Sequence, residues 1–127
     1  MLFRSTSFRY NICITPKMSF GTGHHPTTRL MCQFLQQLSE PPKKVWDIGT
    51  GTGVLAILSE KMGANEVDAT DTDAWSLKNA EENLETNYCG YIDVLGSDTD
   101  ITEAMGKQCD NLTSSAQLAN SRKTMVE

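Results

Sequence analysis

The amino-acid sequence predicts an α/β protein built on part of a doubly wound parallel sheet. Short apolar runs alternate along the chain with segments in which apolar residues recur every three or four positions, and one run turns into such a segment through closely spaced glycines. The short runs are typical of strands buried on both faces of a parallel sheet, and the longer spacing is typical of helices that cover it. Strands and helices that alternate form right-handed βαβ units. We therefore expect a partial parallel sheet of three strands with helices, incomplete toward its C-terminal side.

The elements before the glycines are predicted to be a strand and a helix. Residues 10–14 alternate polar and apolar side chains, which predicts a half-buried strand that leads into Pro16. Pro26 suits the first turn of a helix. We expect that helix to bury one apolar stripe, formed by Met31, Phe34, Leu35 and Leu38.

The strands of the sheet and the helices between them follow from the next part of the chain. We expect the strands over residues 44–48, 66–70 and 91–95. The helix after Gly53 should end at Gly63, because glycine commonly terminates a helix in the left-handed conformation. Asp73 is placed to cap the following helix. The inner face of that helix is expected to consist of Leu77, Ala80 and Leu84.

Charge and composition argue against some classes of partner. The formal net charge of −5, without clustered lysines and arginines, argues against direct binding of nucleic acid. An acidic surface tolerates a basic partner. No apolar run approaches the roughly 18 residues that span a membrane, and the first residues lack the apolar core of a signal peptide. The default location is therefore the cytoplasm.

Neither the cysteines nor the histidines predict a metal site. The cysteines contain no Cys-x-x-Cys pair, and they stand at positions 13, 32, 89 and 109. His24 and His25 are adjacent, so their side chains diverge, and no third ligand at metal spacing accompanies them. We expect reduced, partly buried thiols and no metal ion.

The stretch from Asp47 to Gly53, Asp-Ile-Gly-Thr-Gly-Thr-Gly, is the most informative part of the chain. Glycine lets a backbone turn tightly and approach a ligand, and the free N–H groups at the start of a helix are expected to face that ligand. A dinucleotide site has the longer spacing Gly-x-Gly-x-x-Gly, and a P-loop needs Lys-Ser or Lys-Thr after the last glycine. A carboxylate such as Asp47 would repel a pyrophosphate but suits a cationic sulfonium. The turn therefore favours S-adenosylmethionine, with a glycine-rich turn that binds nothing as the alternative.

Asp71 provides a second feature of the same predicted site. It lies 22 residues after Gly49, at the end of the second predicted strand. A carboxylate there can accept hydrogen bonds from both hydroxyls of a ribose, and ligands of open α/β sheets bind at this edge. A helix cap is the alternative role, which suits Asp73 better. Asp68 is expected to face solvent.

Three segments of the chain together resemble one known family. Residues 17–28, Lys-Met-Ser-Phe-Gly-Thr-Gly-His-His-Pro-Thr-Thr, precede the glycine turn, residues 47–57 contain it, and Asp71-Thr72-Asp73 follows. Over about residues 10–95 the chain resembles the PrmA family, methyltransferases of a bacterial ribosomal protein. The first segment carries most of the specificity. The resemblance implies a Rossmann-like class I methyltransferase fold.

The resemblance also implies a cofactor and the residues that bind it. The cofactor is S-adenosylmethionine, contacted by Thr28, Gly49 and Asp71. Less directly implied are Asp47, Gly51, Gly53, and a loop that looks like a lid over the methionine end, made of Phe20, Gly21, Thr22 and Gly23. No catalytic residue is implied. From the residues alone, the preferred role of Thr28 is to serve only the backbone at its helix end, and the loop could be a surface loop with one anchoring aromatic.

The implied activity is protein N-methylation of amino groups on a basic ribosomal protein of the large subunit. The chain is expected to be truncated, with residues 1–15 a lead-in strand or linker remnant, residues 16–100 the partial cofactor-binding domain and residues 101–127 a polar tail, irregular or weakly helical. No fourth strand is expected, so the outer edge of strand 44–48 would lie open to self-association. Two alternatives remain, a cofactor-binding fragment without catalysis and a nicotinamide-dependent oxidoreductase, which the glycine spacing disfavours.

Overall fold

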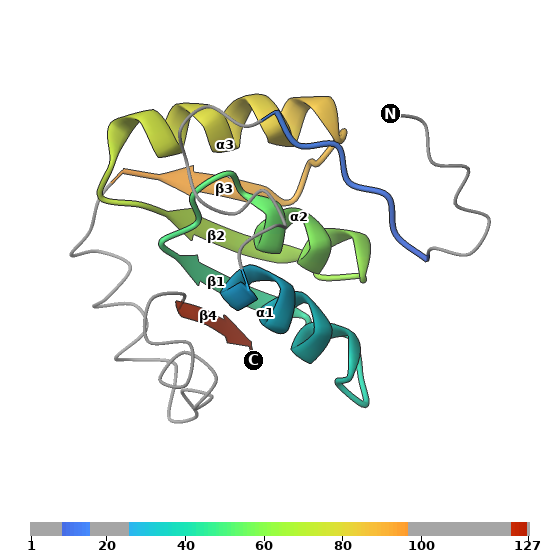
Figure 1. Cartoon of the computed structure of the whole chain (residues 1–127). Coiled ribbons are helices and arrows are strands. Elements are labelled where there is room, and N and C mark those ends of the chain that lie inside the picture. The colour runs from blue at the N-terminus through green and yellow to red at the C-terminus, as the bar shows by residue number, and fades with distance from the viewer. Residues whose placement is uncertain (1–8, 16–25, 97–122, 127) are drawn as a thin grey trace.

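A computed structural model of the chain describes residues 9–15, 26–96 and 123–126. Its elements are, in chain order, α1 (Pro26–Gln36), β1 (Lys44–Ile48), α2 (Val54–Lys61), β2 (Glu66–Thr70), α3 (Ala74–Thr86), β3 (Ile92–Leu95) and β4 (Lys123–Val126). The strands form one sheet in the order β3-β2-β1-β4 (Figure 1), in which the first three are parallel and β4 is antiparallel to β1. The predicted α/β class and partial parallel sheet are confirmed. None of the helices within the described ranges is long and apolar enough to cross a membrane.

Helix α2 packs against the middle of the sheet. Ala56 on this helix and Ala64 just beyond it form a buried cluster with Val45, Val67 and Ala69 of β1 and β2. The small alanine side chains allow the helix backbone to approach the strands closely, as dense packing requires. This cluster fixes α2 over the junction of β1 and β2, the two strands whose ends carry the predicted site.

Helix α1 lies beside α2, as Figure 1 shows. The two helices share a second cluster, which consists of Met31, Leu35, Val54, Leu55 and Leu58. Phe34 and Leu38 are partly buried against it. The stripe predicted for the first helix is therefore confirmed.

Two residues that were predicted to set the ends of helices, Asp73 and Gly63, do so in the structure. The Asp73 side chain caps α3 by accepting the N–H groups of Trp75 and Ser76, at 3.4 and 3.2 Å. Gly63 follows the last turn of α2 with a φ of 118°, in the left-handed region. Both the cap and the terminating glycine are therefore confirmed.

The chain before α1, residues 9–15, is extended but belongs to none of the described strands. The strand predicted for residues 10–14 is therefore wrong. The alternation behind that prediction is real, because every second side chain is half-buried, against the cluster between α1 and α2. The backbone pairs with asparagine side chains of α3 in place of a strand. Asn87, for example, accepts the N–H of Cys13 at 2.9 Å and donates to its carbonyl at 2.7 Å.

The second edge of β1 is occupied by β4, so the prediction of an open edge and no fourth strand is wrong. Residues 123–126, within the tail predicted to be irregular or weakly helical, pair with β1 over four residues. The prediction rested on the apolar run that is typical of a strand buried in a parallel sheet. A short antiparallel edge strand needs only backbone pairing, so it leaves no such run. The rest of the tail lies outside the described residues.

Helix α3 ends with a residue that is strained for its position. Tyr88 has a φ of 57°, the one positive value recorded for a residue other than glycine in the described ranges. Its N–H donates to the Glu85 carbonyl at 3.1 Å, and the N–H of Cys89 donates to the Leu84 carbonyl at 3.0 Å. These two bonds form a Schellman motif, in which this position favours glycine.

Tyr88→Gly is expected to raise the free energy of unfolding by about 1 kcal/mol, because glycine enters the left-handed region without the cost of a β-carbon. Tyr88 is 94% exposed, so the substitution removes little packing. Equilibrium denaturation in urea measures the change. Tyr88→Ala keeps a β-carbon and should bring no such gain. A glycine variant no more stable than the parent chain would contradict the assignment of strain to this residue.

Candidate functional site

The glycine turn joins β1 to α2, and its backbone conformation explains its glycines. Gly49, Gly51 and Gly53 have φ of 78°, 57° and 86°, in the region that side chains disfavour. At Gly53 a β-carbon would also lie 3.3 Å from the β-carbon of Ala80 on α3, closer than ordinary contact. The alternate glycines are therefore required by the turn itself and do not by themselves indicate a ligand.

The N–H groups of the turn are used within the protein. Those of Gly49 and Thr50 both donate to the Thr70 carbonyl, at 2.8 and 2.9 Å. The N–H of Gly53 donates to the Thr50 carbonyl at 2.9 Å. The expectation that such groups face a ligand is wrong for these positions, because a buried donor needs a partner and finds one at the end of β2 or within the turn. The turn offers a ligand close approach to bare backbone, rather than a row of donors.

Asp71 follows β2 and reaches the glycine turn directly. Its Oδ2 accepts the N–H of Gly51 at 3.0 Å, and its Oδ1 accepts the N–H of Asp73 at 3.0 Å. The side chain is half-buried, and each carboxylate oxygen can accept a second hydrogen bond. The structure thus brings together the two features that the sequence places on adjacent strands, and it leaves acceptor capacity on the carboxylate.

Asp47 lies behind the turn. It is fully buried and accepts the Thr50 hydroxyl at 2.8 Å, so it braces the start of the turn. Burial and, second, the charge of Asp47 raise the pKa of the Cys32 thiol to about 11.

Thr28 lies one helical turn before Cys32 in α1 and is fully buried. Its hydroxyl oxygen has no hydrogen-bond partner among the described residues. Burying a hydroxyl without a partner costs about 1–3 kcal/mol. The sequence-based alternative, in which Thr28 serves only the backbone of its helix, would have given this oxygen a partner.

Several predicted residues lie outside the described part of the chain, namely Phe20, Gly21, Thr22, Gly23, His24 and His25. Within the described ranges, no cluster of three or more His, Cys, Asp or Glu side chains is placed to hold a metal ion.

Asp68 is not the solvent-facing acid that was expected. It is half-buried and accepts the indole N–H of Trp46 at 3.1 Å. The parallel register makes these two residues direct neighbours on β1 and β2, which no local pattern reveals. Burial raises the pKa of the Asp68 carboxyl, although the hydrogen bond from Trp46 opposes that shift. Trp46 is itself buried.

A row of buried asparagines, which was not predicted from the sequence, runs along α3 to its C-cap. Asn79, Asn83 and Asn87 follow one another at intervals of four and are at most 8% exposed. Asn83 donates to the carbonyl of Thr52 in the glycine turn at 2.8 Å. Amides at helical spacing beside an apolar stripe are the signal that could have identified them, because residues four apart share a helix face.

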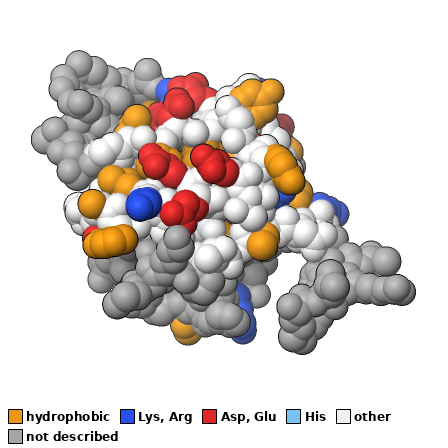
Figure 2. Space-filling view, turned by 90° about the horizontal axis from the view of Figure 1, so that it is seen from above, with side chains coloured by type: hydrophobic (Ala, Val, Ile, Leu, Met, Phe, Trp, Pro, Cys, Tyr) orange, Lys and Arg blue, Asp and Glu red, His pale blue; other side chains and the backbone are white. Residues whose placement is uncertain are grey.

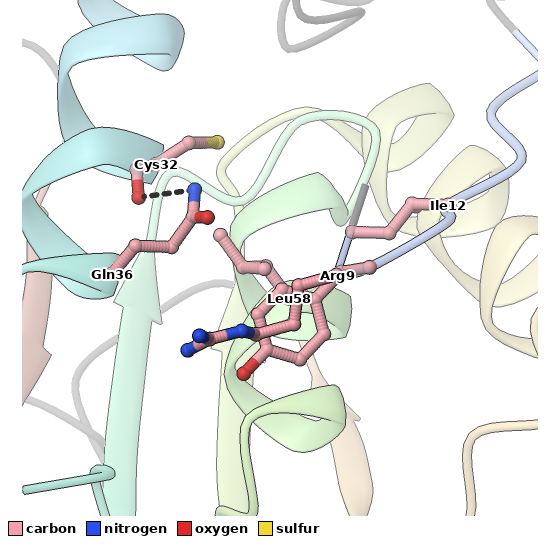
Figure 3. Close-up of a pocket in the computed structure, with 6 residues that line it drawn as sticks. Arg9, Ile12, Cys32, Gln36 and Leu58 are labelled. Atoms are coloured by element: carbon pink, nitrogen blue, oxygen red, sulfur yellow. Dashed lines mark hydrogen bonds between the residues drawn. The ribbon is translucent and has the colours of Figure 1, made fainter. Parts of the chain in front are cut away.

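A cavity of about 220 Å³ lies away from the glycine turn. Figure 3 shows its lining, which consists of Arg9, Tyr10, Ile12, Cys32, Gln36 and Leu58. None of the predicted cofactor-binding residues lines it. The Gln36 amide donates to the Cys32 carbonyl at 3.1 Å, within α1. This cavity therefore adds nothing to the candidate site.

The parallel strands, their helices and the glycine turn define a partial Rossmann-like domain of the class I methyltransferase type. The model of the family described as "Ribosomal protein L11 methyltransferase (PrmA)" matches residues 4–114. The chain belongs to this family, and the predicted resemblance is confirmed.

Curated relatives agree with the family. The ribosomal protein L11 methyltransferase of Chlorobaculum parvum is 43% identical over 119 residues, which are 91% of this chain and 39% of the relative. That of Porphyromonas gingivalis is 44% identical over 90 residues, 71% of this chain and 31% of the relative. The chain thus spans 39% or less of the length of these relatives. A solved structure described as a candidate RNA methyltransferase from Pyrococcus horikoshii aligns with a TM-score of 0.47 at 29% identity, over 57% of this chain and 35% of that one.

Iodoacetamide at about pH 8 is expected to modify Cys13 well before Cys32 and Cys89, because only a thiolate reacts. Burial with the Asp47 charge raises the pKa of Cys32 to about 11, and burial with a hydrogen bond involving Glu60 raises that of Cys89 to about 12. Cys13 is exposed. Mass spectrometry of peptides over time measures the rates. In guanidinium chloride the three should react alike, and rapid modification of Cys32 in the folded chain would contradict its burial.

Proposed function

We propose that this chain is the S-adenosylmethionine-binding part of a protein N-methyltransferase. The observation that carries the proposal is the hydrogen bond of 3.0 Å between the N–H of Gly51 and Oδ2 of Asp71, at the ends of two adjacent parallel strands. Ligands of open α/β sheets bind at that edge of the sheet. Membership of a family of methyltransferases supports a methyl donor as the ligand.

The described residues fit an adenosyl sulfonium. Asp71 would accept the two ribose hydroxyls, because both of its oxygens keep a free lone pair beside their backbone bonds. Gly49 and Gly51 carry no side chain that would keep a ligand from the turn. Thr28 would give the ligand its hydroxyl, which has no hydrogen-bond partner among the described residues. The family resemblance adds residues 20–23 as the cover of the methionine end.

When bound, the cofactor supplies an electrophilic methyl group on a cationic sulfur. Methyl transfer to an amine is an in-line displacement, in which a C–N bond forms as the C–S bond breaks and the sulfur leaves without charge. The protein therefore needs no nucleophilic side chain, and its main task is to hold the donor in one orientation. Accordingly we assign binding residues and no catalytic residue.

The acceptor that we propose is an amino group on a basic protein of the large ribosomal subunit, in the cytoplasm. The relatives are named for methylation of a ribosomal protein. Figure 2 shows acidic side chains gathered on the face seen from above in Figure 1. Helix α3 exposes Glu81 and Glu85. Opposite charge would speed the encounter with a basic protein. The chain spans 39% or less of the length of these relatives, and the part of the reaction that we assign to its described residues is cofactor binding.

Two alternative functions were considered, a nicotinamide-dependent oxidoreductase and a cofactor-binding part without catalysis. A nicotinamide-dependent oxidoreductase is disfavoured by the spacing of the glycines. Asp47, buried and hydrogen-bonded to Thr50 behind the turn, would still disfavour a pyrophosphate there, because buried charges are screened less than exposed ones. A cofactor-binding part without catalysis uses the same residues, so only activity of the longer protein separates it from the enzyme.

Asp71→Asn is expected to weaken binding of S-adenosylmethionine about hundredfold, because hydrogen bonds to a charged acceptor contribute about 1.5–3 kcal/mol. Isothermal titration of the parent chain and the variant with S-adenosylmethionine, and separately with NAD, measures the effect. Asp73→Asn is the matched control, since asparagine also caps a helix and should leave binding unchanged. Binding of NAD alone by the parent chain would overturn the proposed function. Undiminished affinity of the variant would show that the ribose lies elsewhere.

Thr28→Val is expected to change cofactor affinity and stability in opposite directions. Removing the hydroxyl should weaken binding about tenfold. It should also keep or raise the melting temperature, because valine replaces an unpaired buried hydroxyl at similar volume. Titration and thermal denaturation give the two values, and Thr86→Val on the exposed side of α3 should leave affinity unchanged. Loss of stability with unchanged affinity would instead give Thr28 a structural role.

A further inference from the structure

The row of asparagines on α3, Asn79, Asn83 and Asn87, holds the chain before α1. The Asn79 amide donates to the Thr15 carbonyl at 2.9 Å, and Asn87 forms two hydrogen bonds with the backbone of Cys13. The three side chains are 1%, 0% and 8% exposed. Burying an amide costs less free energy when the amide is hydrogen-bonded, so the row and the extended segment stabilise each other, although Oδ1 of Asn79 has no partner among the described residues.

Asn83 differs from its neighbours in the row because it also reaches the glycine turn. Its Nδ2 donates to the carbonyl of Thr52 at 2.8 Å, while its Oδ1 accepts the N–H of Thr15 at 2.9 Å. Among the described residues, the side chains of Asn79 and Asn87 form hydrogen bonds with the extended segment and with α3 itself, and not with the turn. One buried amide therefore joins the extended segment to the turn.

The two halves of the glycine turn are held by different elements. The first half is tied to the end of β2, through the N–H groups of Gly49 and Thr50. The second half meets α3 at two consecutive residues, where Thr52 accepts from Asn83 and Gly53 packs against Ala80. The path of the turn between β2 and α3 thus depends on Asn83 for its polar attachment to α3.

We propose that Asn83 is a positioning residue for the glycine turn and, through it, for the bound cofactor. It touches neither the ribose carboxylate nor the ligand, and it acts by fixing the carbonyl of Thr52 and hence the backbone on which the ligand rests. The second part of this inference rests on the proposed function, and the first part does not.

Amide hydrogen exchange of the 127-residue chain tests the positioning of the turn. Asn83→Ala should raise the exchange rates of the Gly51 and Gly53 N–H groups about tenfold over those of Asn87→Ala, because a lost buried hydrogen bond is worth about that factor. Asn87→Ala removes a buried amide of the same row that does not touch the turn. It therefore controls for general loss of stability. Equal exchange in the two variants would overturn the proposal.

Titration with S-adenosylmethionine tests the consequence for the cofactor. Asn83→Ala should weaken binding about tenfold, and Asn87→Ala less than about twofold, when both are measured well below their melting temperatures. Asn83→Asp keeps the acceptor for Thr15 and loses the donor to Thr52, so it should bind as weakly as the alanine variant. Parent-like binding by Asn83→Asp would overturn the role of the Thr52 contact.

A measurement on the parent chain covers the case in which these variants fail to fold. The side-chain amide resonances of Asn83 should shift when S-adenosylmethionine is added, and those of Asn87 should not. Unmoved Asn83 resonances in a chain that binds the cofactor would overturn the coupling. A parent chain that binds no S-adenosylmethionine would refute the proposed function, whereas hydrogen exchange would still decide whether Asn83 positions the turn.

Discussion

The hydrogen bonds between the glycine turn and the end of β2 are the constraint on which the site depends. The Thr70 carbonyl accepts two N–H groups of the turn, and Asp71, the next residue, accepts a third. This is possible because the parallel register pairs Ile48 with Thr70, so both strands end at the same level. Val45 and Val67 stabilise that register, because they belong to the buried cluster that packs against α2. The geometry of the candidate site is thus a consequence of how the sheet packs.

Features fixed by neighbouring residues were predictable from the sequence. The bounds of β1 and β2 coincide with the apolar runs from which they were predicted, and β3 begins one residue later than expected, at Ile92. Gly63 and Asp73 terminate and cap their helices because each acts on backbone groups within a few positions. The adjacency of the glycine turn and Asp71 was also predictable, since parallel strands carry their carboxyl ends to one edge of the sheet.

Features fixed by distant partners were not predictable in the same way. An alternating pattern shows which side chains of residues 9–15 are buried, but it cannot show that their backbone pairs with side-chain amides. The antiparallel strand at residues 123–126 needs only a free edge of β1, and no periodic pattern of apolar residues indicates it. In the site, the sequence identifies Gly51 as a backbone donor but not Asp71 as its acceptor. The prediction from the sequence therefore overestimated the number of backbone N–H groups that remain free to bind a ligand.

The asparagines along α3 show how hydrogen bonds can fix the register of a segment when apolar contacts leave that register undetermined. The alternating side chains of residues 9–15 would tolerate a shift by two positions, since the same face would stay buried. The hydrogen bonds at Cys13 and Thr15 would not, because each amide of the row would then meet a displaced backbone group. Burial selects the face of the segment, and the amides select its register against α3. The same helix therefore fixes both the register of residues 9–15 and the second half of the glycine turn.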